Sequence, residues 1–153
     1  MLRHISEIVR FSAQALSLSW VPPNFAEEAG EYFENSATRK FLTARGITFP
    51  DEKHLVATFR GGRLMDISMK VIRDFQNVTW RKEDFTEELK NPEYRLHYDE
   101  MVSQLERSGH VTLPAPIILY IKKTGEYWGF SGNRRTNLAL HHNIPLKAWV
   151  VTL

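Results

Sequence analysis

The segment Gly132-Asn133-Arg134-Arg135 contains a glycine, an asparagine and two arginines, and it lies where an extended segment ends and a predicted helix begins. Glycine at such a junction lets backbone N–H groups come close to a ligand. The start of a helix offers N–H groups without intrahelical partners and the positive end of the helix dipole. The two guanidinium groups add charge-assisted donors. These four residues therefore have the composition of a phosphate-binding loop, although a glycine turn with two solvated arginines has the same sequence.

Four elements are predicted around this loop in the C-terminal third of the chain. They are a strand, a second strand, a short helix and a last strand, over residues 117–121, 126–131, 132–143 and 146–152. Asn143 can end the helix in the left-handed conformation, and Pro145 prevents its continuation. The loop is therefore expected between a strand and a helix.

An amphipathic helix is predicted upstream, and it ends at Ser108-Gly109. Its apolar side chains recur at helical spacing, at Tyr94, Tyr98, Met101, Val102 and Leu105. The opposite face carries His97, Glu100, Gln104 and Arg107. The helix is therefore expected to bury one face and to leave a polar face outside the core.

The first third of the chain is predicted to be helical. Apolar residues at helical spacing run from Ile5 to Trp20, and Pro22-Pro23 ends this pattern. Asn24 stands three residues before Glu27, which predicts a capping box at the start of a second helix. These elements define a predicted helical N-terminal extension over residues 1–53.

Ser36 is predicted to cap a third helix, which ends at Gly46. Beyond it, residues 54–60 and 63–72 carry β-branched and aromatic side chains at alternate positions, which is typical of strands. Gly61-Gly62 between these runs predicts a hairpin turn. The main domain is expected to begin with this hairpin and to span residues 54–153.

The 153 residues are 42% hydrophobic and 25% charged, which is the composition of an ordinary globular protein. No apolar run approaches the roughly 20 residues that span a bilayer, and the first residues, with the acidic Glu7, are not expected to be a secretory signal. A cytoplasmic protein without a membrane partner is therefore expected. The absence of cysteine excludes a disulfide framework, a thiolate metal site and a cysteine nucleophile.

Charge is unevenly distributed along the chain. Residues 81–107 contain five basic and eight acidic side chains, whereas residues 110–153 contain five basic side chains and one acidic side chain. The acidic stretch overlaps a predicted surface insertion near residues 77–92. The C-terminal third is therefore the region where an anion is expected to bind.

The tail PAPIILYIKKTGEYWGFSGNRRTNLALHHNIPLKAWVV resembles the ParB/sulfiredoxin superfamily along its whole length. Members of that family have a Pro-Ile strand, a glycine turn, an aromatic strand, a Gly-x-x-Arg loop that opens a helix, and a proline-led final strand. Upstream, LMDISMKVIRD is similar to the family's first strand, and YDEMVSQLERSG to the helix before the Pro-Ile strand. The resemblance implies an α+β fold of the ParB/sulfiredoxin type, a small mixed sheet with helices, preceded by the helical extension.

The resemblance also implies nucleotide binding. In the family, the phosphates of ATP or CTP are held by the loop that matches Gly132, Asn133, Arg134 and Arg135. The face of the preceding helix that contacts the nucleotide corresponds here to His97, Glu100 and Gln104. The basic residue after the first strand corresponds to Arg73, which is expected across the cleft, where it would neutralise developing charge in catalysis.

Hydrolysis would also require a group that orders Mg²⁺ or water. Glu100 is the best candidate, as a metal ligand or as a water-positioning base, although a solvated helix residue is an equally good interpretation. Asp66 and Asp74 are the other candidate carboxylates. Asp66 lies on an exposed strand face, which fits a structural role better.

Two departures limit what the resemblance implies. Sulfiredoxin needs a cysteine directly after the loop glycine, where this chain has Asn133, so sulfinic-acid reduction is excluded. Partition proteins continue into a helix-turn-helix DNA reader, so a chain that ends two residues after Val151 is not expected to be a complete one. The chain most resembles small stand-alone members from plasmids and phages, among them fertility-inhibition (oncogenic-suppression) factors with nucleotide-hydrolase and nuclease behaviour.

The leading hypothesis is a stand-alone nucleotide-binding protein that hydrolyses ATP or CTP with Mg²⁺ and acts on, or cleaves, DNA. With a net charge of +2, DNA binding is expected to be weak, nonspecific and salt-dependent. A second hypothesis is a non-enzymatic inhibitor that binds a protein partner through the N-terminal helices. A third is a small-molecule kinase that transfers phosphate to an acceptor such as serine instead of water.

Overall fold

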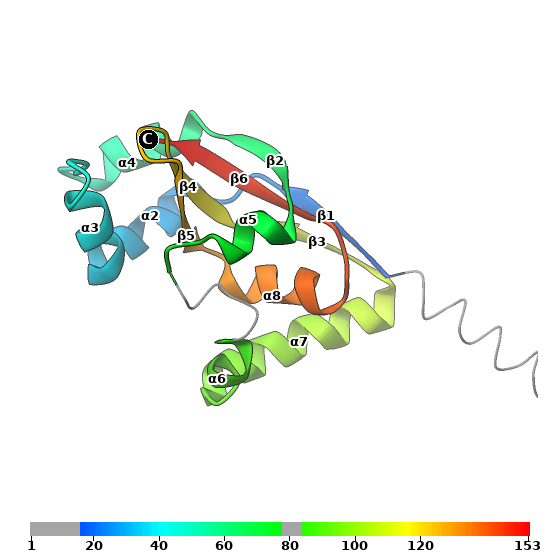
Figure 1. Ribbon diagram of the computed structural model, residues 1–153. Helices are drawn as coiled ribbons and strands as arrows, with labels where there is room; N and C mark the ends of the chain where they lie inside the picture. The colour runs from blue at the N-terminus through cyan, green and yellow to red at the C-terminus, as the bar shows by residue number, and fades with distance from the viewer. Residues whose placement is uncertain (1–15, 78–83) are drawn as a thin grey trace, which may run out of the picture.

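The computed structural model describes residues 16–77 and 84–153, and it shows a mixed α+β fold (Figure 1). The strands are β1 (Ser17–Val21), β2 (Arg63–Ile67), β3 (His110–Pro114), β4 (Ile117–Ile121), β5 (Glu126–Ser131) and β6 (Leu146–Thr152). The helices are α2 (Phe25–Glu34), α3 (Ser36–Thr43), α4 (Glu52–Arg60), α5 (Met69–Arg73), α6 (Phe85–Glu88), α7 (Pro92–Ser108) and α8 (Asn133–His141). The general α+β class expected from the sequence is confirmed.

The main sheet has four strands in the order β2-β6-β4-β5, and β1 pairs with β3 in a separate two-stranded sheet. β4 and β5 form an antiparallel hairpin, α8 follows, and β6 then pairs in parallel with β4. β2 lies antiparallel to β6 at the other edge. α8 is the connection between the antiparallel hairpin and the parallel strand β6, and a helix is the usual connection of this kind. Gly132 alone separates β5 from α8, so the expected phosphate-binding loop lies at this junction.

One face of the main sheet is covered by the N-terminal helices, as Figure 1 shows. Side chains along a strand alternate between the two faces, so Ile117, Leu119 and Ile121 of β4 point to the same side. They share a buried cluster with residues of α2, α3 and α4, namely Ala29, Tyr32, Phe41, Leu42, Leu55 and Phe59. These three helices and the sheet therefore enclose one continuous core.

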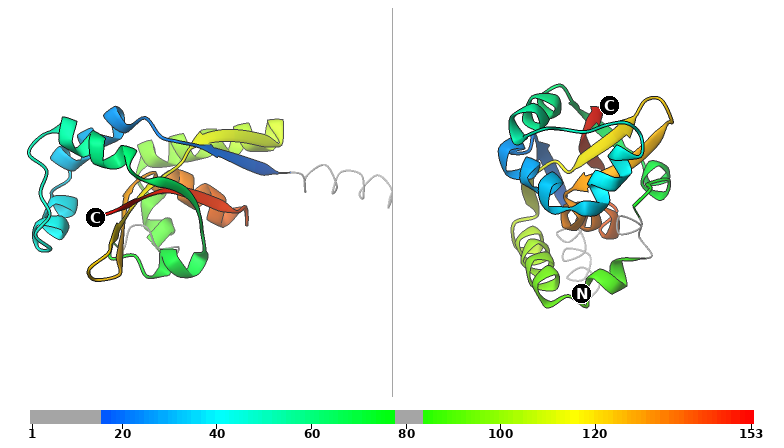
Figure 2. Two further views of the ribbon diagram at one scale, coloured as in Figure 1. Left: turned by 90° about the horizontal axis from the view of Figure 1, so that it is seen from above. Right: turned by 90° about the vertical axis from the view of Figure 1, so that its left-hand side faces the viewer.

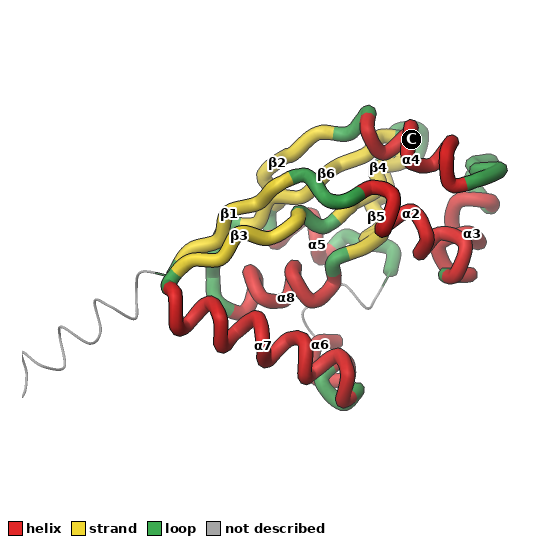
Figure 3. The backbone as a smooth tube through the Cα atoms, turned by 180° about the vertical axis from the view of Figure 1, so that it is seen from behind, coloured by secondary structure: helices red, strands yellow, loops and turns green. Residues whose placement is uncertain are grey.

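The opposite face of the sheet is covered by α5 and α8. Ile118 of β4 lies in a second buried cluster with Ile72 of α5 and Ala139 of α8. α7 packs on α8 in turn, where Leu105 and Leu138 share a third cluster. Figure 2 shows the order of these layers from two further sides, and Figure 3 shows α7 beside α8 from behind. The start of α8 is thus surrounded by elements from both ends of the chain.

The helix predicted through Trp20 is wrong at its described end, because these residues form strand β1. The side chains of β1 alternate between inward and outward positions, a period of two. Its parallel partner β3 was not predicted, and the Ser17 and Ser19 hydroxyls contact the ring nitrogens of His110 on that strand at 2.7 and 3.1 Å. Pairing with β3, a strand distant in the sequence, therefore makes residues 17–21 a strand. Residues 1–15 of the predicted helix lie outside the described residues.

The strand predicted over residues 54–60 and the glycine hairpin after it are also wrong, because this segment forms helix α4. The Asp51 side chain accepts a hydrogen bond from the His54 N–H at 2.9 Å and caps the helix. Leu55 and Phe59 are its buried residues. Positions four apart lie on one side of a strand and also on one side of a helix, so their pattern fits both structures, and the aspartate cap favours the helix.

The strand predicted over residues 63–72 is correct only in its first part. β2 ends at Ile67, and Ser68 then caps the short helix α5. In the same way α3 is capped by Asn35, one residue before the predicted Ser36. In both places a polar side chain that accepts backbone N–H groups sets the start of the helix.

The predicted elements around the loop are confirmed. β4, β5 and β6 lie within the predicted ranges. Gly109 caps the end of α7 and Asn143 lies two residues after α8, and both residues have left-handed backbone conformations. Asn24 accepts the Glu27 N–H at 3.2 Å, as its cap requires. Of the predicted insertion near residues 77–92, residues 78–83 lie outside the described residues, and α6 follows them.

Within residues 16–77 and 84–153, no helix is both long enough and apolar enough to span a bilayer.

Arg45 and Glu126 join the end of α3 to the start of β5. The Nε and Nη2 groups of Arg45 donate to the two carboxylate oxygens of Glu126 at 2.6 and 2.7 Å. Hydrogen bonding to Arg45, and then to Thr124, lowers the pKa of Glu126 from 4.5 to about 2. A carboxyl with a lowered pKa stabilises the fold above its unfolded pKa, and this contribution is lost as the pH falls from about 4.5 to about 2.

Glu126→Gln is therefore expected to weaken the acid dependence of stability. Urea unfolding at pH 5 and at pH 2.5, followed by circular dichroism, should show a smaller loss of unfolding free energy in the variant than in the wild type. Glu87→Gln is the matched control, because it removes an exposed carboxylate that pairs with Lys90, and it should keep the wild-type dependence. An unchanged dependence in Glu126→Gln would contradict the prediction.

Candidate functional site

Gly132 forms the turn from β5 into α8 and is the N-cap residue of that helix. Its φ of 93° lies in the left-handed region, which favours glycine. A Cβ atom at this position would lie 2.6 Å from Cβ and 2.8 Å from Cα of Pro116. The glycine is therefore required by the close packing of this turn on the segment that leads into β4.

The first turn of α8 lacks a side-chain cap. The N-cap side chains of α2, α3, α4, α5 and α7 each accept a backbone N–H, whereas Gly132 has no side chain that could do so. Ser131, just before it, is 3% exposed, and its hydroxyl has no hydrogen-bond partner among the described residues. Backbone donors and a buried hydroxyl thus meet at the positive end of a helix, which suits an anion.

The two arginines of the loop have different environments. Arg135 donates to the Pro114 carbonyl at 2.9 Å and to the Glu28 carboxylate at 3.1 Å, and its side chain is only 15% exposed. Arg134 is half-buried, and its guanidinium carbon lies 5.6 Å from the centre of the Tyr94 ring. Arg135 therefore braces α8 against α2, and Arg134 is the guanidinium that is placed to meet a ligand.

Three polar side chains join α7 to the first turns of α8. The Tyr94 hydroxyl donates to Oδ1 of Asn133 and accepts from Nδ2 of Asn137 at 2.9 Å. Asn137 also donates to Asn133 at 3.1 Å. Burial raises the pKa of Tyr94 to about 12, so its phenol remains a donor at neutral pH. The Asn133 side chain therefore holds the helix pair together.

The structure brings the predicted residues of α7 to the same cavity as the loop. His97, Glu100 and Gln104 line it together with Gly132, Asn133, Arg134 and Arg135. His97 Nδ1 lies 3.7 Å from a Glu100 carboxylate oxygen, and the Glu100 side chain is 65% exposed. An exposed carboxylate at the rim of the cavity can reach water or a metal ion that a ligand carries.

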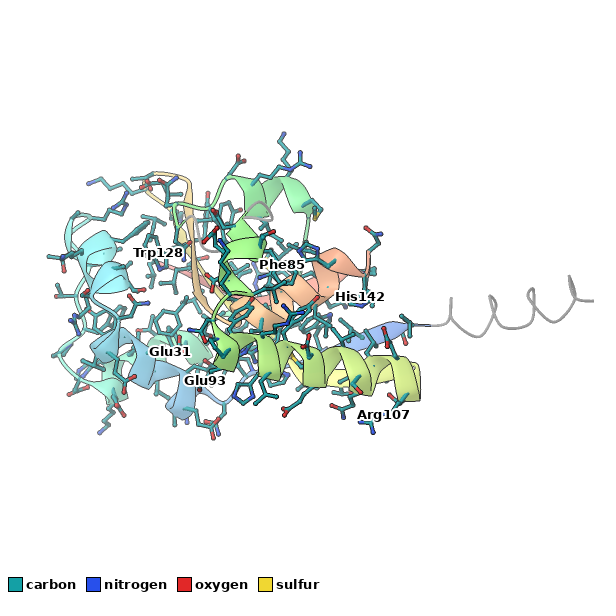
Figure 4. All side chains as sticks on the ribbon, turned by 90° about the horizontal axis from the view of Figure 1, so that it is seen from below. Glu31, Phe85, Glu93, Arg107, Trp128 and His142 are labelled. Atoms are coloured by element: carbon teal, nitrogen blue, oxygen red, sulfur yellow. The ribbon has the colours of Figure 1, made fainter. Side chains whose placement is uncertain are left out.

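A third wall, from α2, was not foreseen from the sequence. Glu28, Glu31 and Asn35 line the cavity, and Figure 4 shows Glu31 on the side of α2 nearest to α7. Glu31 is exposed on the surface of α2, and its partial burial in the cavity wall, followed by the charge of Glu28, raises its pKa to about 7. The sequence signal is the spacing of two glutamates by three residues, which puts them on one face of a helix. The N-terminal helices were expected to bind a protein partner in the inhibitor hypothesis, and no part of the cavity was predicted on them.

The walls enclose a cavity of about 690 Å³, a size typical of small-molecule sites. Its carboxylates are Glu28, Glu31, Glu88 and Glu100, and its guanidinium groups are Arg134 and Arg135. Burial also raises the pKa of Glu88. The cavity thus has a cationic end at the start of α8 and acidic walls beyond it.

Arg73 is not among the residues that line this cavity. It is the exposed last residue of α5, a helix held by Ile72 in a cluster that contains Ala139 and Leu140. Those residues belong to the second half of α8, whereas the cavity lies at the first turn of the same helix. The position expected across the cleft is therefore not occupied by Arg73. Asp66 and Asp74 do not line the cavity either.

Metal-binding capacity in the described ranges is limited. No group of three or more His, Cys, Asp or Glu side chains there could hold a metal ion. Mg²⁺ commonly takes one or two protein carboxylates and completes its shell with substrate phosphates and water. A single carboxylate such as that of Glu100 would therefore suit only a Mg²⁺ ion that a bound phosphate group carries into the cavity.

Comparison of the chain with protein-family models, with curated proteins and with solved structures found no match. The resemblance to the ParB/sulfiredoxin superfamily therefore stays a hypothesis. What the cavity does has to be inferred from its own residues and their geometry.

Proposed function

We propose that this chain binds a nucleoside triphosphate, ATP or CTP, in the cavity and hydrolyses it. The observation that carries the proposal is the convergence of three features on one cavity: the first turn of α8, Arg134 and the polar face of α7. A cavity of about 690 Å³ accommodates a ligand of this size. The N–H groups at the start of α8 would receive the phosphates.

Arg134 is the proposed phosphate ligand. Its neighbour Arg135 is already held by Glu28 and by the Pro114 carbonyl, so its role is to keep the loop in place. Arg134 pairs with no carboxylate among residues 16–77 and 84–153, and such an arginine can bind a phosphate with two parallel hydrogen bonds. The backbone N–H groups of Gly132 and Asn133 would add neutral donors beside it.

Glu100 is proposed to hold Mg²⁺ or to orient the attacking water. Several carboxylates line the cavity, so an unaccompanied triphosphate would be repelled, and Mg²⁺ carried on the phosphates reduces that repulsion. In hydrolysis, water attacks the terminal phosphorus, and the bond from this phosphorus to the bridging oxygen breaks. The products are inorganic phosphate and the nucleoside diphosphate.

Arg134→Ala is expected to weaken the binding of ATP and CTP by about ten- to a hundredfold. Hydrogen bonds to charged groups contribute about 1.5–3 kcal/mol, and each 1.4 kcal/mol changes Kd about tenfold. Calorimetric titration of each nucleotide, with and without Mg²⁺, measures this change. Arg107→Ala is the control, because Arg107 is an exposed arginine toward the far end of α7, outside the cavity (Figure 4).

The titration has two outcomes that count against the proposal. Unchanged affinity in Arg134→Ala would mean that the phosphates do not bind at this loop. Absence of saturable binding of both nucleotides to the wild type would overturn the function itself, and the inhibitor hypothesis would then be tested with protein partners.

A phosphate-release assay then separates hydrolysis from group transfer. Free phosphate formed from the bound nucleotide supports the hydrolase. Phosphate found on added serine, with none released, supports the kinase hypothesis instead.

Action on DNA also stays a prediction. The acidic walls of the cavity repel a nucleic-acid backbone, so a DNA contact would have to use other surfaces. Weak binding that disappears at moderate salt is the expected behaviour.

A further inference from the structure

Glu31 lies on the wall of the cavity contributed by α2. It follows Glu28 by three residues and lines the cavity together with the loop from Ser131 to Arg135. The ion pair between Glu28 and Arg135, with both side chains only 15% exposed, joins this part of α2 to α8. This largely buried ion pair therefore fixes the position of Glu31 relative to the cationic end of the cavity at the start of α8.

Ser131 gives an independent indication that a polar ligand binds at this end of the cavity. The residue is 3% exposed and lines the cavity, and its hydroxyl has no partner within the part of the chain that the structure describes. Buried polar atoms are almost always hydrogen-bonded. A ligand oxygen beside the first turn of α8 would provide that partner.

We propose that Glu31 binds the anionic ligand in its protonated form and donates a hydrogen bond to a phosphate oxygen. One proton from solvent then enters the cavity with the ligand, and no covalent bond of the ligand changes. This inference rests on the proposed function, because it concerns the ligand of the same cavity. A carboxylic acid donates to an anion that a carboxylate would repel.

The surroundings of Glu31 favour the protonated form. Burial and the charge of Glu28 raise its pKa to about 7, and Glu34 on the same helix adds to this effect. Arg135 and Arg134, from α8, act in the opposite direction. A phosphate at the start of α8 would bring negative charge and offset the two arginines, so ligand binding should raise the pKa of Glu31 further.

Other titratable groups line the cavity on α6 and α7. They are Glu88, Tyr94, His97 and Glu100. The phenol of Tyr94 stays neutral, because burial raises its pKa to about 12. The test therefore includes variants of His97 and Glu88, so that an effect of these other walls is not attributed to Glu31.

The test is calorimetric titration with ATP, with CTP and with inorganic triphosphate at pH 6, 7 and 8, in two buffers with different ionisation enthalpies. The wild type should take up most of one additional proton at pH 8, and its Kd should rise about tenfold between pH 6 and pH 8 relative to Glu31→Gln. The glutamine amide donates a hydrogen bond without titrating, so Glu31→Gln should keep its affinity. The ligand's own titration contributes equally to both proteins and cancels in the difference.

Three further variants make the result specific to Glu31. Glu27→Gln removes a charge from the same helix outside the cavity and should behave like the wild type. His97→Asn and Glu88→Gln should retain the additional proton uptake. Glu31→Ala cannot donate and should lose affinity even at pH 6.

The other outcomes distinguish a failure of the Glu31 inference from a failure of the nucleotide proposal. Equal proton uptake by the wild type and Glu31→Gln would overturn the inference and leave nucleotide binding intact. Binding of triphosphate without binding of ATP or CTP would overturn the nucleotide proposal and keep the Glu31 contact. If none of the nucleotides and no inorganic triphosphate binds at any pH, both the nucleotide proposal and the Glu31 inference are overturned.

Discussion

Phe59→Ala is expected to lower the free energy of unfolding by about 3–5 kcal/mol, the usual cost of truncating a fully buried phenylalanine. Phe59 is 0% exposed, and its ring centre lies 5.0 Å from that of Phe130 on β5. The carbonyl of the same residue accepts the Trp149 indole N–H at 2.6 Å. Truncation would leave a cavity between α4 and the sheet, with both backbones held in place around it.

The same variant tests whether the N-terminal helices unfold together with the sheet. Because their residues share one buried cluster, circular dichroism and tryptophan fluorescence should report one coincident transition in denaturant. Leu96→Ala is the control, since Leu96 is 57% exposed on α7, and it should change stability by no more than about 0.5 kcal/mol. Two separate transitions would instead support an independent unit over residues 1–53.

Gly132→Ala is expected to lower the free energy of unfolding by about 2–5 kcal/mol. A left-handed conformation costs a non-glycine residue about 1–2 kcal/mol, and overpacking adds about 1–3 kcal/mol. The new Cβ would lie 2.6 Å from Pro116, whose carbonyl accepts the Trp149 N–H at 2.8 Å within the sheet. Because Pro116 is anchored, the first turn of α8 would have to move, and ATP affinity should fall as well.

Gly125→Ala separates these two contributions. Gly125 also has a left-handed φ, of 74°, but no atom lies within 4 Å of the Cβ that the substitution would add. It should therefore cost only the conformational part, about 1–2 kcal/mol. Urea unfolding of both variants measures the difference. Equal losses of unfolding free energy in the two variants would show that the contact with Pro116 does not exclude a Cβ atom at position 132. Unchanged ATP affinity in Gly132→Ala would show that this turn does not position the phosphates.

The loop and the helices beside it were predictable from local signals. Gly132 between a strand and a helix, Gly109 at the end of α7 and Asn143 after α8 all act through backbone conformations that neighbouring residues specify. The polar face of α7 also follows from helical spacing. These features involve residues within a few positions of one another, and a sequence displays such relationships directly.

The roles of the loop arginines and of Glu31 were not predictable in this way. Arg134 and Arg135 are adjacent and chemically identical. Glu28 pairs with Arg135, which therefore braces α8, and this leaves Arg134 as the proposed ligand-binding group. Glu31 has a raised pKa because burial and a neighbouring charge combine on a wall of the cavity. Both outcomes depend on residues that are distant in the chain and meet only after folding.

The sequence alone determined that the chain is an α+β protein whose C-terminal third carries a glycine-arginine loop at the start of a helix. The tertiary structure decided that β1 is a strand, through its pairing with β3, whereas the aspartate cap of helix α4 was a local signal that the sequence already carried. It also placed Arg73 outside the cavity and brought α2 into its wall. The reason is physical: caps and turns are set by neighbouring residues, whereas strand pairing, burial and charge are set by contacts across the whole chain.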